Sequence, residues 1–273
     1  MQIDPKNGLN SQIIEMAREL GACAAGIADV EALKKSPSHL IYPHFGRYKS
    51  CLNNEVPRDS GEVLWPPSAK SAIVIAVEHP EDKPELDWWQ DGLKGGTPGN
   101  KELMTIVARL SDWLRKEKNY GIKGLPYYVV QGGIFLKDAA VMAGLGCIGK
   151  NNMLVTPEYG PRVRLRAAFL NIKLPASVPS DFDPCPACDM PCRKICPQKA
   201  FQKKIHIDNQ FGLSQLPGRS GVYSRPLCKD QMELDTENAN KTAKENQHGL
   251  IRLVKCCRLC ETSCPVGKKN LNS

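Results

Sequence analysis

Cysteine is the residue type whose spacing in this chain most clearly indicates chemistry. The sequence has 12 cysteines in 273 residues, and nine of them lie between Cys185 and Cys264. They are too few for a disulfide scaffold of this length, whereas crowded thiols in a reducing compartment are typical of metal binding. The last third of the chain is therefore expected to bind metal.

Two cysteine runs have the spacing of ligands for cubane iron–sulfur clusters. The first, residues 185–197 (CPACDMPCRKICP), is one residue longer than the bacterial ferredoxin run Cys-x2-Cys-x2-Cys-x3-Cys-Pro. The second, residues 257–265 (CRLCETSCP), repeats its ending. In such runs three close thiolates bind one cluster, and the fourth reaches a different one. We therefore expect two 4Fe-4S clusters with crossed ligation.

Crossed ligation assigns eight cysteines to the two clusters. The expected ligands of one cluster are Cys185, Cys188, Cys192 and Cys264, and those of the other are Cys196, Cys228, Cys257 and Cys260. Cys256 is left out because Cys257 keeps the two-residue spacing to Cys260. Structural zinc is the alternative, but its paired Cys-x2-Cys knuckles leave the Cys-Pro endings unexplained. The lone cysteines are expected to be small core residues: Cys23, Cys51 and Cys147.

Charge and hydropathy narrow the class of protein. The formal net charge is +8, and residues 181–273 hold fifteen Lys and Arg against ten Asp and Glu. Two oxidised cubanes with their thiolates add about two negative charges each, which nearly neutralises this excess.

The longest apolar run, Ala72–Val77, is too short to cross a bilayer, and Met1–Leu20 has no continuous apolar segment. We expect a cytoplasmic protein, with nucleic-acid binding as an alternative.

Residues 1–178 alternate helical and strand patterns, which predicts a mixed α/β domain. The linker 175–184 (PASVPSDFDP) cannot build a core and leads into a second domain, residues 179–273. The predicted helices are 11–20, 101–118 and 135–143, and the predicted strands are 71–78, 127–130 and 164–170. Loop 81–100 is long enough for a lid or substrate wall, or is a packed surface loop. Residues 230–248 are expected to be a solvated helix or a loose excursion.

A glycine-rich loop, residues 144–151 (GLGCIGKN), follows the last predicted helix of the first domain. It superficially fits a dinucleotide fingerprint or a phosphate loop. However, its glycines follow a helix rather than a strand, and Lys150 is followed by Asn where a phosphate loop needs Ser or Thr. The residues alone also fit a helix C-cap and tight turn, which needs glycine at positive φ.

With its continuation to Gly160 (AGLGCIGKNNMLVTPEYG from Ala143) and the two cysteine runs, this loop resembles epoxyqueuosine reductases, a family similar in turn to the reductive dehalogenases. The likeness includes residues 67–76 (PSAKSAIVIA) and 19–27 (ELGACAAGI). It implies an α+β architecture, in which a nitroreductase-like α/β domain binds cobalamin with its lower base detached. A ferredoxin-like domain with two 4Fe-4S clusters would follow and pass electrons to the cobalt.

The resemblance also implies roles for individual residues. Those expected to line the cobalamin are Gly144, Gly146, Gly149, Lys150, Asn151, Met153 and Tyr159. The general-acid aspartate of the family aligns with Gln131, which cannot donate a titratable proton. The other candidate proton donors near the presumed site are Tyr127, Tyr128 and Lys137. The alternating arginines Arg162, Arg164 and Arg166 should share one strand face, either meeting an anionic group or lying in solvent.

These observations predict a cobalamin-dependent oxidoreductase whose clusters are reduced by a donor such as ferredoxin or flavodoxin. The chain ends within ten residues of Cys264, short of the RNA-binding repeats of the family. A small-molecule substrate other than epoxyqueuosine in tRNA is therefore expected. Two alternatives stay open: a non-enzymatic electron carrier or reductive activator of a partner's corrinoid protein, and an RNA-binding module with structural metal.

Overall fold

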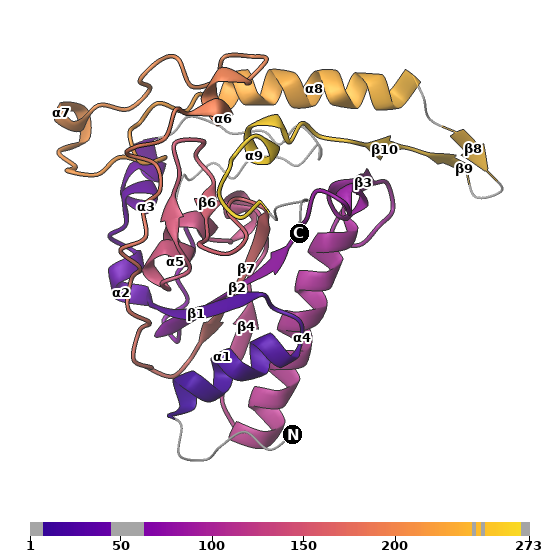
Figure 1. The fold of residues 1–273 in the computed structure, drawn as a ribbon. Coiled ribbons are helices and arrows are strands. Elements are labelled where there is room, and N and C mark those ends of the chain that lie inside the picture. Colours follow the sequence, from indigo (N-terminus) through magenta and orange to yellow (C-terminus); the bar gives the residue numbers. More distant parts are fainter. Residues whose placement is uncertain (1–7, 45–62, 242–243, 247–248, 269–273) are drawn as a thin grey trace.

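The structure is a computed structural model that describes residues 8–44, 63–241, 244–246 and 249–268. Its central element is an antiparallel four-stranded sheet in the order β1-β2-β7-β4. Figure 1 shows helices on both sides of this sheet and a layer of short elements across one end of it. The strands of the sheet are β1 (Ala24–Asp29), β2 (Ser71–Glu78), β4 (Ile122–Gly124) and β7 (Val163–Leu170).

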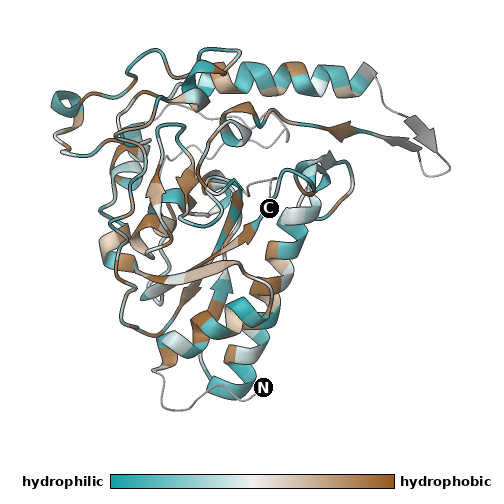
Figure 2. Ribbon diagram, in the orientation of Figure 1, coloured by the Kyte–Doolittle hydropathy of each residue, from teal (hydrophilic) through white to brown (hydrophobic). Residues whose placement is uncertain are grey.

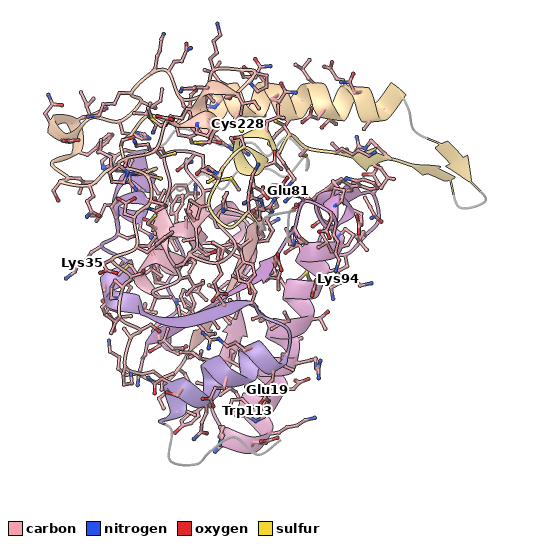
Figure 3. The ribbon with its side chains drawn as sticks, viewed as in Figure 1. Glu19, Lys35, Glu81, Lys94, Trp113 and Cys228 are labelled. Atoms are coloured by element: carbon pink, nitrogen blue, oxygen red, sulfur yellow. The ribbon has the colours of Figure 1, made fainter. Side chains whose placement is uncertain are left out.

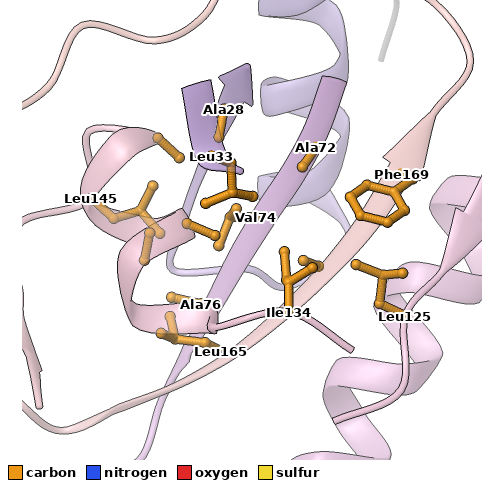
Figure 4. Close-up of a cluster of buried hydrophobic side chains, with 14 of the residues drawn as sticks. Ala28, Leu33, Ala72, Val74, Ala76, Leu125, Ile134, Leu145, Leu165 and Phe169 are labelled. Carbon is orange, nitrogen blue, oxygen red and sulfur yellow. The ribbon is translucent and has the colours of Figure 1, made fainter. Parts of the chain in front are cut away.

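Strand β2 gives the sheet two apolar faces, because successive side chains of a strand point to opposite sides. Its odd-numbered residues from Ile73 to Val77 pack with α1 (Leu9–Glu19) and α4 (Pro98–Lys118). Its even-numbered residues from 72 to 76 pack with α2 (Val30–Leu33) and α5 (Leu136–Met142), as Figure 4 shows in part. The sheet is thus covered on both faces.

Helix α5 approaches the sheet most closely at Gly26 in β1. A Cβ atom added at Gly26 would lie 2.1 Å from the carbonyl oxygen of Ala143, at the C-terminal end of α5. Only glycine allows such an approach of backbone to backbone. The contact fixes the end of α5 against β1, and with it the start of the glycine loop.

The cysteine-rich region consists of one long helix, α8, and several short elements joined by loops. Helices α6 and α9 carry cysteines of the two runs and contact each other. Figure 1 shows α8 along the outer side of this layer, and in Figure 2 its surface is mostly hydrophilic. The elements are α6 (Pro191–Lys194), α7 (Asp208–Phe211), α8 (Arg225–Lys241), β8 (Lys244–Asn246), β9 (Gly249–Ile251), β10 (Leu253–Val254) and α9 (Leu259–Thr262).

Five predicted elements of the first region are confirmed with small shifts of their ends. Strand 71–78 matches β2, strand 164–170 corresponds to β7, and the three predicted helices correspond to α1, α4 and α5. Short elements that were not predicted include α3 (Pro37–Ile41), the 3-10 helix η1 (Tyr42–His44) and the hairpin of β5 (Cys147–Ile148) and β6 (Leu154–Val155).

The predicted strand at 127–130 is wrong. Residues Val129–Gln131 form the 3-10 helix η3, and the edge strand beside β7 is β4, which ends three residues before Tyr127. The cause is the glycine pair that follows. Gly132 has φ of 98°, and the N–H of Gly133 donates to the carbonyl of Tyr128, so the chain closes into a tight turn instead of extending.

Loop 81–100 is packed against the cysteine-rich region. It contains the 3-10 helix η2 (Pro84–Asp87) and the short strand β3 (Trp89–Gln90), and β3 pairs with β10. A Cβ at Gly96 would lie 2.0 Å from the ring of Trp89, so the loop is also packed within itself. These contacts favour the interpretation as a packed loop.

The predicted linker and the polar stretch 230–248 have different structures. The linker has no helix or strand, but Ser177 exchanges hydrogen bonds with Ile27 of β1: the Ile27 N–H donates to the Ser177 hydroxyl at 2.9 Å, and the Ser177 N–H donates to the Ile27 carbonyl. The polar stretch is helical up to residue 241, as part of α8. Among the described helices, none combines the length and apolar character needed to cross a membrane.

Candidate metal centre

Four cysteines from the two runs line one pocket, together with Lys150 and Asn151 of the glycine loop. The four, which we call the first cysteine group, are Cys185, Cys188, Cys192 and Cys264. Cys192 and Cys264 are buried. Burial and the thiolates of the other three members raise the pKa of Cys192. The structure thus brings together the cysteines that the sequence assigned to one cluster.

The remaining four predicted ligands also lie near one another. They form the second cysteine group: Cys196, Cys228, Cys257 and Cys260. Burial raises the pKa of Cys260 to about 12, and the other three members contribute to this rise. Cys228 and Cys196 likewise contribute to the raised pKa of Cys257, after burial and Asp235. Thiolates gathered in this way repel one another, and a bound metal offsets that repulsion.

Backbone N–H groups point at the sulfur atoms of both groups. The N–H groups of Lys150, Met190 and Ala200 each donate to a cysteine Sγ at 3.4 Å, and their acceptors are Cys185, Cys188 and Cys196. Met190 has φ of 58°, so the chain turns sharply where the first run is one residue longer than the ferredoxin pattern. Hydrogen bonds to sulfur are among the features that set the potential of iron–sulfur clusters.

The two lone cysteines that the structure describes lie outside both groups of ligands. Cys23 packs against the apolar cluster beneath α5, and burial raises its pKa to about 12. Cys147 is half-buried in β5, and burial raises its pKa to about 11. Cys51 lies outside the described residues. Among the described residues, no group of three or more His, Cys, Asp or Glu side chains is arranged to hold a single metal ion.

The glycine loop contacts both cysteine groups. The backbone N–H of Lys150 donates to Cys185, and the Lys150 carbonyl accepts from Nε of Arg193 at 2.6 Å. The side-chain amide of buried Asn151 donates to the carbonyl of Cys260 at 3.2 Å. The loop is therefore one wall of the candidate metal centre.

The three glycines of this loop pack against the chain itself. A Cβ at Gly144 would lie 2.4 Å from the carbonyl oxygen of Val178, and one at Gly146 would lie 2.2 Å from that of Val155. At Gly149 the nearest atoms belong to Val155 and Asn151, with the Cys185 sulfur at 3.7 Å. Gly144 has φ of 77° and follows the end of α5, as a helix C-cap requires. Glycine is needed here for packing, whatever else the loop binds.

The other predicted site residues have varied environments. Gln131 is exposed in η3, and Tyr127 is 44% exposed, with its ring edge-on to Tyr128 at 5.2 Å. Met153 and Tyr159 are half-buried beside the loop. Gln131, Tyr127 and Tyr128 thus share one surface turn, and the tyrosines are not the core residues that strand tyrosines usually are.

Lys137 lies close to the second cysteine group. Its ammonium donates to the carbonyl of Asn152 at 2.6 Å and lies 5.9 Å from the centre of the Tyr223 ring. Burial lowers the pKa of Lys137 to about 8, and the charges of Cys228 and Cys260 are among those that oppose this shift. A lysine with this pKa exchanges protons near neutral pH.

Arg164 and Arg166 of β7 share one strand face, as predicted, but Arg164 and Arg162, which directly precedes β7, contact protein groups of the second cysteine run. Arg162 is 4% exposed and donates to the carbonyls of Cys264 and Val266, both at 2.8 Å. Arg166 donates to Oδ1 of Asn100 at 2.7 Å. From the sequence, these three arginines are expected to face solvent or an anionic ligand. In the structure, Arg162 and Arg164 instead bind carbonyl and carboxylate oxygens of the chain itself.

Arg164 belongs to a closed ring of alternating charges. It binds both oxygens of Asp87, at 2.8 and 2.9 Å, and Glu261 at 2.7 Å. Arg258 binds the same two carboxylates. Burial raises the pKa of Asp87, but the hydrogen bond from His79 and the charges of Arg164 and Arg258 outweigh it and lower that pKa. The ring fastens the second run to the sheet.

Sequence reasoning missed most of this ring. Asp87 lies in a loop, and Arg258 and Glu261 resemble ordinary charged residues between cysteines. The only available signal was Glu261 itself, a carboxylate next to a presumed ligand in a short helix. Its partners are distant in sequence, so neither spacing nor periodicity connects them.

The helix-covered sheet, the glycine loop and the paired cysteine groups define a protein of mixed helices and strands with a cysteine-rich C-terminal region. The chain is similar to epoxyqueuosine reductases. It is 25% identical over 270 residues to the epoxyqueuosine reductase of Bacillus cereus, with 95% of this chain and 65% of that relative covered. The chain thus spans slightly less than two thirds of the length of this relative. No family model matches the chain.

Solved structures share the fold. The epoxyqueuosine reductase of Streptococcus thermophilus aligns with a TM-score of 0.60 at 21% identity, covering 96% of this chain and 66% of that one. A reductive dehalogenase, described as suggesting a mechanism for B12-dependent dehalogenation, aligns with a TM-score of 0.58 at 16% identity, covering 97% and 34%. The resemblance inferred from the sequence is therefore confirmed, and its named relatives are oxidoreductases.

Proposed function

We propose that this chain is a reductase that binds two 4Fe-4S clusters and passes electrons from them to a corrinoid held beside the glycine loop. The observation that supports this most is the gathering of eight cysteines into two groups, one of which contacts the loop through Lys150 and Cys185. In this proposal a nitroreductase-like domain, residues 1–178, precedes a ferredoxin-like domain, residues 179–273.

The donor set fits iron–sulfur clusters. Each group supplies four sulfur atoms, and backbone N–H groups donate to three of the eight. A bound cluster supplies one-electron redox chemistry. Around it, the chain excludes water through buried residues such as Cys192 and Cys264 and directs N–H groups at the sulfur atoms.

The corrinoid is supported by the relatives and by the position of the loop. One structural relative is titled for B12-dependent dehalogenation. A corrinoid supplies a cobalt centre with strongly reducing chemistry. A ligand at the loop would lie beside the first cysteine group, because Lys150 and Asn151 line the same pocket as those cysteines. The residues proposed to contact it are Gly144, Gly146, Gly149, Lys150, Asn151, Met153 and Tyr159.

Substrate, proton donor and electron donor complete the proposal. We assign a small-molecule substrate other than epoxyqueuosine, and a donor such as ferredoxin or flavodoxin. Lys137 is a candidate proton donor because its pKa, lowered by burial to about 8, lies near the working pH of a general acid. Tyr127 and Tyr128 are the other candidates, in the exposed turn that also carries Gln131.

Metal analysis of the chain purified without oxygen, from cells supplied with a corrinoid, tests this proposal. We expect about eight iron atoms per chain, a brown colour and bound cobalt. A colourless sample that contains zinc in place of iron would overturn the whole proposal. A sample with iron that never contains cobalt would overturn the corrinoid and leave the clusters.

A second candidate is an electron carrier or reductive activator for the corrinoid of a partner protein. It is favoured by Gln131, an exposed amide at the position where the family has its general acid. This function predicts that the clusters are reduced and re-oxidised by a partner corrinoid protein, with no turnover of substrate. Substrate turnover by the isolated chain would exclude it.

A further inference from the structure

Arg162 holds the turn that carries Cys264 into the first cysteine group. Its guanidinium donates through Nη1 to the carbonyl of Val266 and through Nη2 to the carbonyls of Cys264, at 2.8 Å, and Thr262, at 3.4 Å. These carbonyls lie at or just after the end of the short helix α9, where no further helical turn can satisfy them. One side chain therefore binds three backbone oxygens around a proposed ligand.

The surrounding chain leaves little room for a different arrangement. A Cβ at Gly160 would lie 2.0 Å from the carbonyl oxygen of Val266, and one at Gly267 would lie 2.3 Å from the backbone of Tyr159 and Gly160. The turn therefore rests directly on the backbone that leads into β7. Arg162 directly precedes this strand and forms an ion pair with Glu81, at 2.7 Å, which Figure 3 labels.

The neighbouring charge ring serves a different part of the run. Arg164 and Arg258 bind the side chain of Glu261 beside the second cysteine group. Arg162 instead binds main-chain oxygens at Cys264, a member of the first group. Arg162 and Arg164 therefore act on different cysteine groups.

We propose that Arg162 is a positioning residue that holds Cys264 as the fourth ligand of the first cluster and raises the reduction potential of that cluster. This inference rests on the proposed function, in which the first cysteine group binds a 4Fe-4S cluster. Reduction adds a negative charge to the cluster, and a buried cation nearby stabilises the added charge. The planar guanidinium also matches three carbonyls in a way that lysine cannot.

Redox titration of the reconstituted full chain, followed by electron paramagnetic resonance, tests this role. In Arg162→Met we expect the ratio of reduced to oxidised cluster, measured at a fixed applied potential, to fall about tenfold for one of the two clusters. For a one-electron couple this corresponds to a reduction potential that is lower by about 59 mV. The other cluster should keep its potential. Cys264→Ser identifies the affected cluster, because it removes a proposed ligand and should perturb the same resonance.

Arg166→Met is the matched control, since Arg166 lies on the same strand face but binds Asn100. Arg162→Lys keeps the positive charge but loses the contact with three carbonyls. The reduction potential of the affected cluster should therefore be closer to that of the unmodified chain than to that of Arg162→Met. Glu81→Gln should shift the same cluster in the opposite direction, because it removes the anion that pairs with Arg162. That shift is smaller, since the Glu81 side chain is 44% exposed and solvent screens it.

The proposal is overturned if Arg162→Met and Arg166→Met give the same potentials, or if the shift falls on the cluster that Cys264→Ser leaves unchanged. If Arg162→Met does not fold, Glu81→Gln decides, and an unchanged or lowered potential there overturns the proposal. An unmodified chain without iron would overturn the proposed function itself, before any variant is compared.

Discussion

The carboxylate of Glu261, between two cysteines of the second run, is bound at 2.7 Å by Arg164 of the central sheet. Ninety-seven residues separate the two partners, and the Glu261 side chain is only 2% exposed. Arg258 binds the same carboxylate, so one acidic side chain satisfies two arginines. The pair links the candidate metal centre directly to the core of the first region.

Glu261→Gln is expected to lower the free energy of unfolding by about 3 kcal/mol. The amide keeps the shape of the side chain but removes one of the two carboxylates of the ring, so Arg164 and Arg258 share only Asp87, and breaking a buried ion pair is strongly destabilising. Denaturant unfolding without oxygen measures this. Asp112→Asn is the control, because its pair with Arg115 is exposed and should contribute less than about 1 kcal/mol. Equal losses in both variants would contradict the prediction.

His39 should make folding stability depend on pH between about 4 and 6.5. Burial lowers its pKa from 6.5 to about 4, so on acidification the unfolded chain binds a proton before the folded chain does. Stability is therefore retained above pH 6.5 and is lost as the pH falls toward 4. The Phe135 N–H donates to Nε2 at 3.2 Å, so the neutral ring carries its proton on Nδ1, facing Ser36.

His39→Gln removes this titration, and the slope of unfolding free energy against pH should flatten in that window. His206→Gln is the comparison, because His206 is also buried in part and burial lowers its pKa as well. Unfolding curves from pH 4.5 to 7 measure both. An unchanged slope in His39→Gln would show that other groups carry the pH dependence.

Gly26→Val is expected to destabilise the chain by about 1 to 3 kcal/mol and to reduce its iron content. The new side chain would clash with the carbonyl of Ala143 and displace the end of α5, where the glycine loop begins. Thermal unfolding and iron analysis measure the two effects. Gly92→Asn is the control, since nothing lies within 4 Å of a Cβ there and Asn tolerates its positive φ. Full iron content in Gly26→Val would refute the link to the loop.

Gln131→Asp should raise the rate of epoxyqueuosine reduction about a hundredfold over the unmodified chain, because it restores a group that can donate a proton. Gln131 is exposed, so stability should change by less than about 0.5 kcal/mol. Single-turnover assays with the fully reduced chain measure the rate. Gln131→Asn provides the neutral comparison, and equal rates for the Asp and Asn variants would rule out this position as the missing acid.

Sequence patterns predicted the parts of the structure that depend on local chemistry. The apolar run 71–78 could only be buried on both faces, and it forms β2 with the predicted ends. The Cys-Pro endings predicted a crossed arrangement, and Cys264 indeed lies with the first run. In both cases the information was contained in a few neighbouring residues.

Long-range packing could not be predicted in this way. The turn at Tyr127 depends on two glycines that follow an apolar stretch resembling a strand. The arginine stripe of β7 has the pattern of a solvated face, because its partners come from the loop at Asp87 and from the second cysteine run. Such pairings depend on the assembled fold, and no local pattern encodes them.

The contacts of Arg162 and Arg164 indicate whether the N-terminal region can fold without the cysteine-rich region. A truncation after residue 178 would remove the backbone oxygens that bind Arg162 and the Glu261 carboxylate that binds Arg164, and it would uncover the part of the sheet on which these contacts lie. The isolated N-terminal piece should therefore fold poorly by itself. Loss of iron and melting of the sheet should then occur as one cooperative event, as in a single folding unit rather than two independent ones.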